Sequence, residues 1–263
     1  MSGGASFPPF PSETKPVRFW LLRRCHRGWL VPKNYTSRFV VLSSAKGPLL
    51  DPTMLFRFEV RLQQHALDWT SRGLSLPTSC RVPSFAALSG GPIYADVRIA
   101  WDVSGIGFHL LVNGKRQLPW CRETRLDESD GLHLWMDTRN SPNIHRATQH
   151  CHRFLWLPAG GGPKRERPVA AMVPINRART NPKPIRPDAL KIHAIPRHDG
   201  YELSGLIPAA ALTGYDPKDQ SQIGFYYLVA DRELGNQALT LSTDFPVAED
   251  PSLWSEAALI SNS

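Results

Sequence analysis

The stretch Tyr94-Ala-Asp-Val-Arg-Ile-Ala-Trp-Asp102 alternates apolar and polar side chains, and it decides the fold class of this chain of 263 residues. Its apolar positions 97, 99 and 101 would share one face of an extended strand, with charged side chains on the other face. A glycine-containing turn follows at 104–107, and residues 108–115 have the composition of a return strand. The pattern predicts a β-hairpin that buries one of its faces.

The same two-residue period recurs along most of the chain. A short helical turn is expected at 208–212. Several short strands joined by turns indicate an all-β protein, and we predict a single antiparallel β-sandwich domain over residues 54–263. The other predicted strands are 55–62, 131–137, 149–157, 200–207 and 223–231.

Residues 158–190 interrupt this pattern, because they are rich in proline, glycine and basic side chains. One strand-like piece, residues 169–175, lies inside the segment. We interpret the whole segment as a long excursion within one domain rather than as a domain boundary. A loop of this length in a compact domain is typically functional or mobile.

The net charge of +8 lies almost entirely in the first fifty residues. That segment holds eight Lys or Arg side chains and one acid, whereas the rest of the chain holds 23 basic and 22 acidic side chains. Nucleic acids are recognised through basic surfaces, so we expect no nucleic-acid partner for the body of the chain. No apolar run reaches the ~18 residues of a membrane span, and we expect no span.

Residues 1–53 are interpreted as a basic, poorly ordered tail. Met54 directly precedes the first predicted strand, so an alternative is that translation starts there and the tail does not exist in the cell. Three arginines between residues 23 and 27 interrupt the apolar region that a secretory signal needs. The four cysteines form no CxxC pair. We therefore expect a cytoplasmic protein with free thiols.

Four motifs in order carry a resemblance to a known family. They are Ala100-Trp-Asp102, residues 129–137, Gly200-Tyr-Glu-Leu203 and Asp250-Pro-Ser-Leu-Trp254. In order and spacing they resemble the family 9 carbohydrate-binding module, a DOMON-like β-sandwich, over roughly residues 54–262. The block from 137 to 154 is not part of the general family pattern and looks like the mark of a distinct bacterial branch. The resemblance implies sugar binding without catalysis.

The resemblance also implies a site, because the family holds a sugar between aromatic side chains with polar groups around it. A pyranose offers an apolar face to a flat ring and hydroxyls to donors and acceptors. Trp120 stands close to where the family places one aromatic platform, and Phe245 is the only aromatic substitute for the second. The predicted ligand-binding residues are Trp120, His133, Asp137, His150, His152, Arg153 and Phe245.

The histidines support a second hypothesis, of a different class. His150 and His152 are two positions apart and would share one face of a strand, and His133 and Asp137 could face them from a neighbouring strand. Imidazoles at 133, 150 and 152 would bind Zn²⁺ in a metal-binding protein or a metal-dependent enzyme. Hydrogen bonding within a polar face is the simpler interpretation of the same residues. Calcium beside Asp231 is a further alternative.

The sequence contains no G-x-S-x-G, H-E-x-x-H or P-loop signature. We expect no catalytic residue and no obligatory cofactor. The leading hypothesis is a non-catalytic module that binds a carbohydrate or a related polyol. A scaffold of the same fold without a ligand is the remaining alternative. Trp101, Trp135, Trp156 and Trp254 are expected to pack in the core rather than to serve as platforms.

Overall fold

The computed structural model describes residues 58–85, 90–186, 188–240 and 245–261. The predictions for the 1–53 tail and for a start at Met54 therefore lie outside the described residues. Within the described residues, no helix is long and apolar enough to cross a membrane. The three cysteines in this part of the chain, Cys80, Cys121 and Cys151, are buried free thiols.

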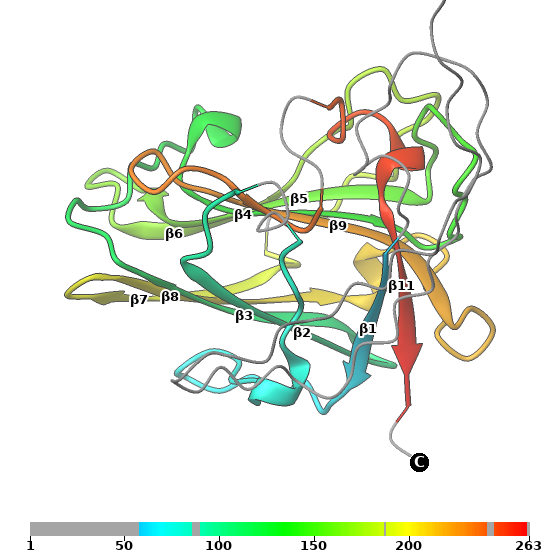
Figure 1. The fold of residues 1–263 in the computed structure, drawn as a ribbon, viewed down its shortest axis with the longest axis horizontal. Coiled ribbons are helices and arrows are strands. Elements are labelled where there is room, and N and C mark those ends of the chain that lie inside the picture. The colour runs from blue at the N-terminus through cyan, green and yellow to red at the C-terminus, as the bar shows by residue number, and fades with distance from the viewer. Residues whose placement is uncertain (1–57, 86–89, 187, 241–244, 262–263) are drawn as a thin grey trace, which may run out of the picture. The chain divides into compact units, whose positions relative to one another are not determined.

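The strands form a two-layered β-sandwich, which confirms the predicted fold class (Figure 1). Their order is β6-β5-β4-β9-β11-β1-β2-β3-β8-β7, with β10 added beside β9. In Figure 1, β6, β5, β4 and β9 form one layer and β2, β3, β8 and β7 form the other, while β1 and β11 run across one end. One continuous ladder thus folds over onto itself and encloses the core.

The elements have the following bounds in the structure. The strands are β1 (Glu59–Gln64), β2 (Ala95–Asp102), β3 (Gly105–Asn113), β4 (Gly131–Asp137), β5 (Cys151–Gly161), β6 (Arg167–Met172), β7 (Lys191–Arg197), β8 (Gly200–Pro208), β9 (Gln222–Ala230), β10 (Gln237–Ala238) and β11 (Ser255–Ile260). The described helices are the 3₁₀ turns η2 (Thr78–Cys80), η4 (Leu126–Glu128), η5 (Ala209–Ala211) and η6 (Pro251–Leu253).

The hairpin predicted from residues 94–115 is confirmed by β2 and β3, which pair antiparallel from Ala95 opposite Val112 to Asp102 opposite Gly105. The turn is shorter than predicted, because β3 already begins at Gly105. A Cβ atom at residue 105 would lie 2.1 Å from the carbonyl oxygen of Ile207 on β8. Only glycine therefore lets β3 and β8 approach this closely at the start of the strand.

Two features of the ladder differ from the prediction. The strand β1 pairs parallel with both β11 and β2, so the sheet is not wholly antiparallel. The strands β7, β10 and β11 were not predicted, because β10 has only two residues and neither β7 nor β11 has a clear apolar alternation. In β11, the adjacent residues Ala257 and Ala258 point to opposite faces, so both faces carry a small apolar side chain. Only the burial in the folded strand alternates. A small side chain gives the period-2 pattern little contrast.

The excursion predicted for residues 158–190 is wrong at its start. The strand β5 continues to Gly161, and a short turn leads back through β6, so a hairpin fills the first half of the segment. Glycine has a low strand propensity, which made this run look like a loop. At Gly160, a Cβ atom would come within 3.0 Å of Cys121, so the glycines allow β5 to pass close to the 121–122 backbone.

The core lies between the two layers. Phe108 on β3 and Trp156 on β5 meet edge to face there, with ring centroids 4.9 Å apart. Gly205 on β8 makes room for this pair, since a Cβ atom at that position would lie 2.3 Å from the Phe108 ring and 2.8 Å from the Trp156 ring. The predicted core tryptophans are confirmed as buried, and they are Trp101, Trp135, Trp156 and Trp254.

We expect Gly205→Ala to destabilise the protein by about 1–3 kcal/mol, because the added methyl group overpacks the contact between the layers. Urea unfolding measures the change. The cost should shrink in a Phe108→Leu background, where the ring that meets the methyl group is gone. An unchanged unfolding midpoint for the single variant would show that the layers separate easily at this point.

Candidate functional site

The outward face of β4 carries polar side chains on a strand that is buried throughout. His133 lies opposite Leu228 on β9 and Leu155 on β5, and Trp135 lies opposite Arg153 on β5. In an antiparallel pair, opposed residues point to the same side of the sheet. His133, Trp135 and Arg153 therefore project together from the side of β4 and β5 that faces away from the core.

These three side chains line a cavity of about 430 Å³, together with Arg232 and the acidic turn at 127–128. Three atoms on these side chains are buried and have no hydrogen-bond partner among the described residues: His133 Nε2, Trp135 Nε1 and Arg153 Nε. Indole and guanidinium nitrogens only donate hydrogen bonds. The residues that line the cavity thus carry two unmatched donors and one unpaired imidazole nitrogen, whereas buried polar groups in proteins are normally paired.

His133 is held in its neutral form in this cavity. Burial, together with a smaller effect of the nearby positive charge of Arg153 and against the opposing charge of Asp127, lowers its pKa to about 3. A neutral imidazole has one donor and one acceptor nitrogen. His133 can therefore serve a hydroxyl group, which is itself both donor and acceptor.

Two arginines of the cavity stack on tryptophan rings. The Arg153 guanidinium lies 5.1 Å from the centroid of the Trp135 ring, and that of Arg232 lies 3.3 Å from the centroid of Trp120. Each of the two is paired with an acid of the η4 turn, Arg153 with Asp127 and Arg232 with Glu128. The two arginines and the two acids of the turn thus line the cavity together.

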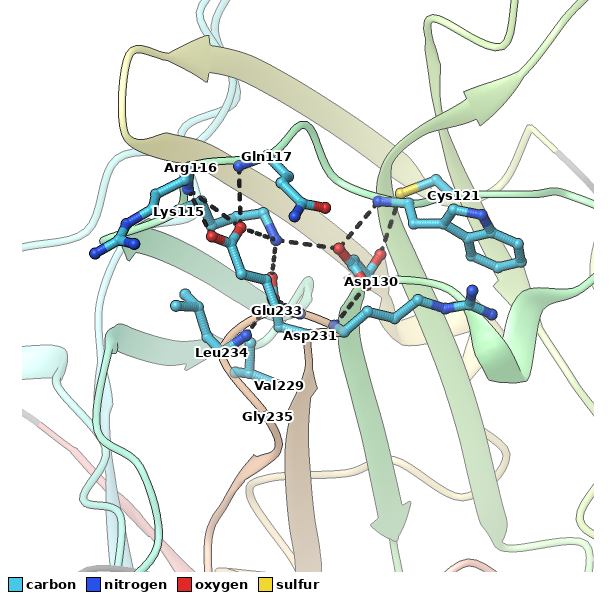
Figure 2. Close-up of polar contacts among 12 residues, drawn as sticks. Lys115, Arg116, Gln117, Cys121, Asp130, Val229, Asp231, Glu233, Leu234 and Gly235 are labelled. Atoms are coloured by element: carbon cyan, nitrogen blue, oxygen red, sulfur yellow. Dashed lines mark hydrogen bonds and ion pairs between the residues drawn. The ribbon is translucent and has the colours of Figure 1, made fainter.

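A buried ion cluster holds the loops around this cavity (Figure 2). Lys115 Nζ lies 3.2 Å from Asp130 Oδ2, 2.5 Å from Asp231 Oδ2 and 3.8 Å from Glu233 Oε2. The Lys115, Asp130 and Asp231 side chains are at most 2% exposed. Burial works to lower the pKa of Lys115, but the hydrogen bonds and charges of Asp231 and Asp130 outweigh it and raise the pKa. We call these four residues the Lys115 cluster.

The carboxylates of the Lys115 cluster also accept backbone hydrogen bonds from the surrounding loops, as Figure 2 shows. Asp130 accepts from the amides of residues 120 and 232. Asp231 accepts from those of 233 and 234, and Glu233 accepts from those of 116 and 117. These bonds help to lower the pKa of Glu233. Each acid therefore fixes the backbone of a neighbouring loop.

Replacing Lys115 with methionine should cost about 3–5 kcal/mol, because two buried carboxylates would lose their counter-ion. The free energy of unfolding in urea measures this loss. Arg186→Met is the matched control, since it breaks the solvent-exposed pair with Asp188 and should change the stability by less than about 1 kcal/mol. Equal effects of the two variants would contradict a structural role for the Lys115 cluster.

The structure brings only some of the predicted ligand-binding residues to this cavity. His133 and Arg153 line it, whereas Trp120 does not line it and contacts Arg232, which does. Trp120 is half-buried, and its ring faces the guanidinium of Arg232 rather than an open platform surface. Trp135, predicted for the core, lines the cavity with its indole nitrogen unpaired, so it belongs to both.

Asp137 and Phe245 lie elsewhere. The Asp137 carboxylate accepts hydrogen bonds from the amides of residues 139 and 141, so it closes the turn after β4. It faces a different cavity, of about 240 Å³, beside Trp254. Phe245 is half-buried and packs against the main core.

The prediction that His150 and His152 face His133 is wrong. His152 lies opposite Met136, and Met136 is on the core-facing side of β4, whereas His133 is on the outward side. His152 points to the same face as Met136, its partner on β4, and Met136 stands three positions after His133. Because successive residues of a strand alternate between faces, His133 and His152 lie on opposite faces. The proposed metal set of His133, His150 and His152 is therefore not assembled. Among the described residues, no group of three His, Cys, Asp or Glu side chains could hold a metal ion.

His150 and His152 instead clamp the loop after η5. The Thr213 amide donates to His152 Nε2 at 2.9 Å, while His152 Nδ1 lies 3.0 Å from the His150 carbonyl oxygen. His150 Nδ1 lies 3.2 Å from the Thr213 carbonyl oxygen. These contacts require a neutral His152 that donates from Nδ1 and accepts at Nε2. In agreement, burial lowers the pKa of His152 to about 4.

Because the folded protein lowers the pKa of His152 from its ordinary 6.5, neutral His152 stabilises the fold above that pH. This contribution should be lost as the pH falls from 6.5 towards 4. His152→Gln should therefore flatten the decline of urea stability over this range. His198→Gln, at an exposed position, should leave the decline unchanged. A decline equally steep in both variants would show that His152 does not titrate on unfolding.

Comparison with family models gives no match for the sequence, and none of the curated proteins matches it. Solved structures do match. Two are structures of a family 9 carbohydrate-binding module from Caldicellulosiruptor kristjanssonii, in complex with cellotriose and with glucose. The cellotriose complex aligns with a TM-score of 0.51 at 12% identity, over 78% of this chain and 95% of that one. For the glucose complex the TM-score is 0.53 at 11% identity, over 78% and 97%. The chain thus has the fold of these modules, as its motifs predicted.

Proposed function

We propose that this protein is a non-catalytic carbohydrate-binding module and that the sugar binds in the cavity lined by His133, Trp135 and Arg153. The observation that carries the proposal is the set of three buried, unpaired polar atoms on these side chains. Leaving a buried donor unpaired costs about 1–3 kcal/mol each, a cost that the hydroxyl oxygens of a sugar would remove on binding.

The size and composition of the cavity agree with a small polar ligand. Its volume of about 430 Å³ falls in the range of small-molecule sites. Leu228 and Ala230 of β9 supply apolar surface for the carbon face of a pyranose, and the nitrogen donors stand beside them. The matched modules, which were solved with cellotriose and glucose, share this fold and make a sugar the first ligand to test.

Calorimetric titration with glucose, cellotriose and a panel of neutral and acidic sugars tests the proposal. We expect binding by the native protein and a loss of at least about tenfold in affinity for His133→Phe and for Trp135→Phe. Both changes keep a buried ring and remove a nitrogen, so the strand should stay packed.

His109→Phe is the matched control. His109 lies on β3 in the other layer, its Nδ1 is also buried and unpaired among the described residues, and it lines a different cavity of about 610 Å³. We expect this variant to bind as the native protein does. Loss of binding in His109→Phe with unchanged binding in His133→Phe would move the site to the other layer. Absence of binding for every sugar, with a folded protein, would refute the proposed function.

A further inference from the structure

Arg153, which lines the cavity, uses only one of the two nitrogens on one edge of its guanidinium group. Its Nη2 atom pairs with Asp127, whereas Nε, on the same edge of the guanidinium, is buried and unpaired among the described residues. This edge matches a carboxylate with two parallel hydrogen bonds. Asp127 therefore accepts from only one of the two donors, Nε and Nη2, that a bidentate carboxylate would engage.

Asp127 is suited to give up this position. Its side chain is 65% exposed, whereas that of Arg153 is 13% exposed. It stands on η4, a 3₁₀ turn of three residues whose side chains are not buried. Because the Asp127 carboxylate is open to solvent, it regains water when it leaves Arg153, and an incoming carboxylate would replace its charge.

Within the described part of the chain, the other acids around the cavity do not form ion pairs with the two cavity arginines. Asp130 and Asp231 are buried and are engaged by Lys115 and by backbone amides. Only Asp127 and Glu128, both on the exposed turn, are paired with the two cavity arginines, Arg153 and Arg232. If an anionic ligand displaced Asp127, it would meet a cationic guanidinium already stacked on Trp135.

We propose that the sugar recognised by this cavity carries a carboxylate, so that the ligand class is uronic acids and their glycosides. The ligand carboxylate would replace Asp127 on the Nε and Nη2 edge of Arg153, and ring hydroxyls would engage His133 and Trp135. This inference rests on the proposed function, because it uses the same cavity.

Calorimetry with matched pairs of methyl glycosides tests the inference: glucoside against glucuronide, galactoside against galacturonide, and mannoside against mannuronide. We expect at least one uronide to bind about tenfold or more tightly than its neutral partner, as a charge-assisted hydrogen bond would give. This preference should weaken as salt is added.

The variant Asp127→Asn removes the competing carboxylate and should tighten uronide binding severalfold, with little effect on neutral glycosides. Asp188→Asn makes the same change of charge in the exposed pair with Arg186, and it should leave uronide binding unchanged. Circular dichroism checks that both variants are folded.

The outcomes separate this inference from the proposed function. Equal or tighter binding of all neutral partners would overturn the uronic acid inference and leave the sugar-binding function intact. Uronide binding that Asp127→Asn leaves unchanged or weakens would overturn the exchange at Arg153. No binding of either kind would remove both proposals.

Discussion

The arrangement of this end of the sandwich depends on the ion pairs that the buried ammonium group of Lys115 forms with Asp130 and Asp231. Lys115 follows β3 in one layer, whereas Asp130 precedes β4 and Asp231 follows β9 in the other layer. One buried cation therefore ties the two layers together where their loops meet. The ionic contacts offset the cost of burying the charges only because the backbone amides complete the coordination of each carboxylate.

This arrangement explains why the cavity beside the Lys115 cluster is rich in donors. The buried acceptors of Asp130 and Asp231 are committed to the loops, so they cannot pair with the nitrogens of His133 and Trp135 on the outward face of β4. The strand β4 that carries His133 and Trp135 is buried throughout, so few other partners are within reach. The unpaired nitrogens thus result from how the two layers are held together. Acceptor oxygens would complete their hydrogen bonding.

The alternation of apolar side chains predicted the hairpin of β2 and β3 and the bounds of β4, because each has one face that must be buried. It also placed His133 on a polar face. It could not supply the register between β4 and β5, since a shift of one residue reverses which side chains meet, and His152 consequently proved to be a core-side clamp. The burial of Lys115 depends on residues more than a hundred positions away, a pairing that no local pattern indicates.

Trp120 shows how the position of a residue can be foreseen while its role changes. The sequence places an aromatic ring at the edge of the site, but the Arg232 guanidinium lies 3.3 Å from the ring centroid and covers the surface on which a sugar would stack. The guanidinium group that covers this ring face is itself engaged by the backbone and the carboxylate of Glu128. Under the proposed function, recognition at this cavity would depend on hydrogen bonds more than on apolar stacking. A site built in this way discriminates strongly, because a ligand that lacks one of the required oxygens leaves a buried donor unpaired.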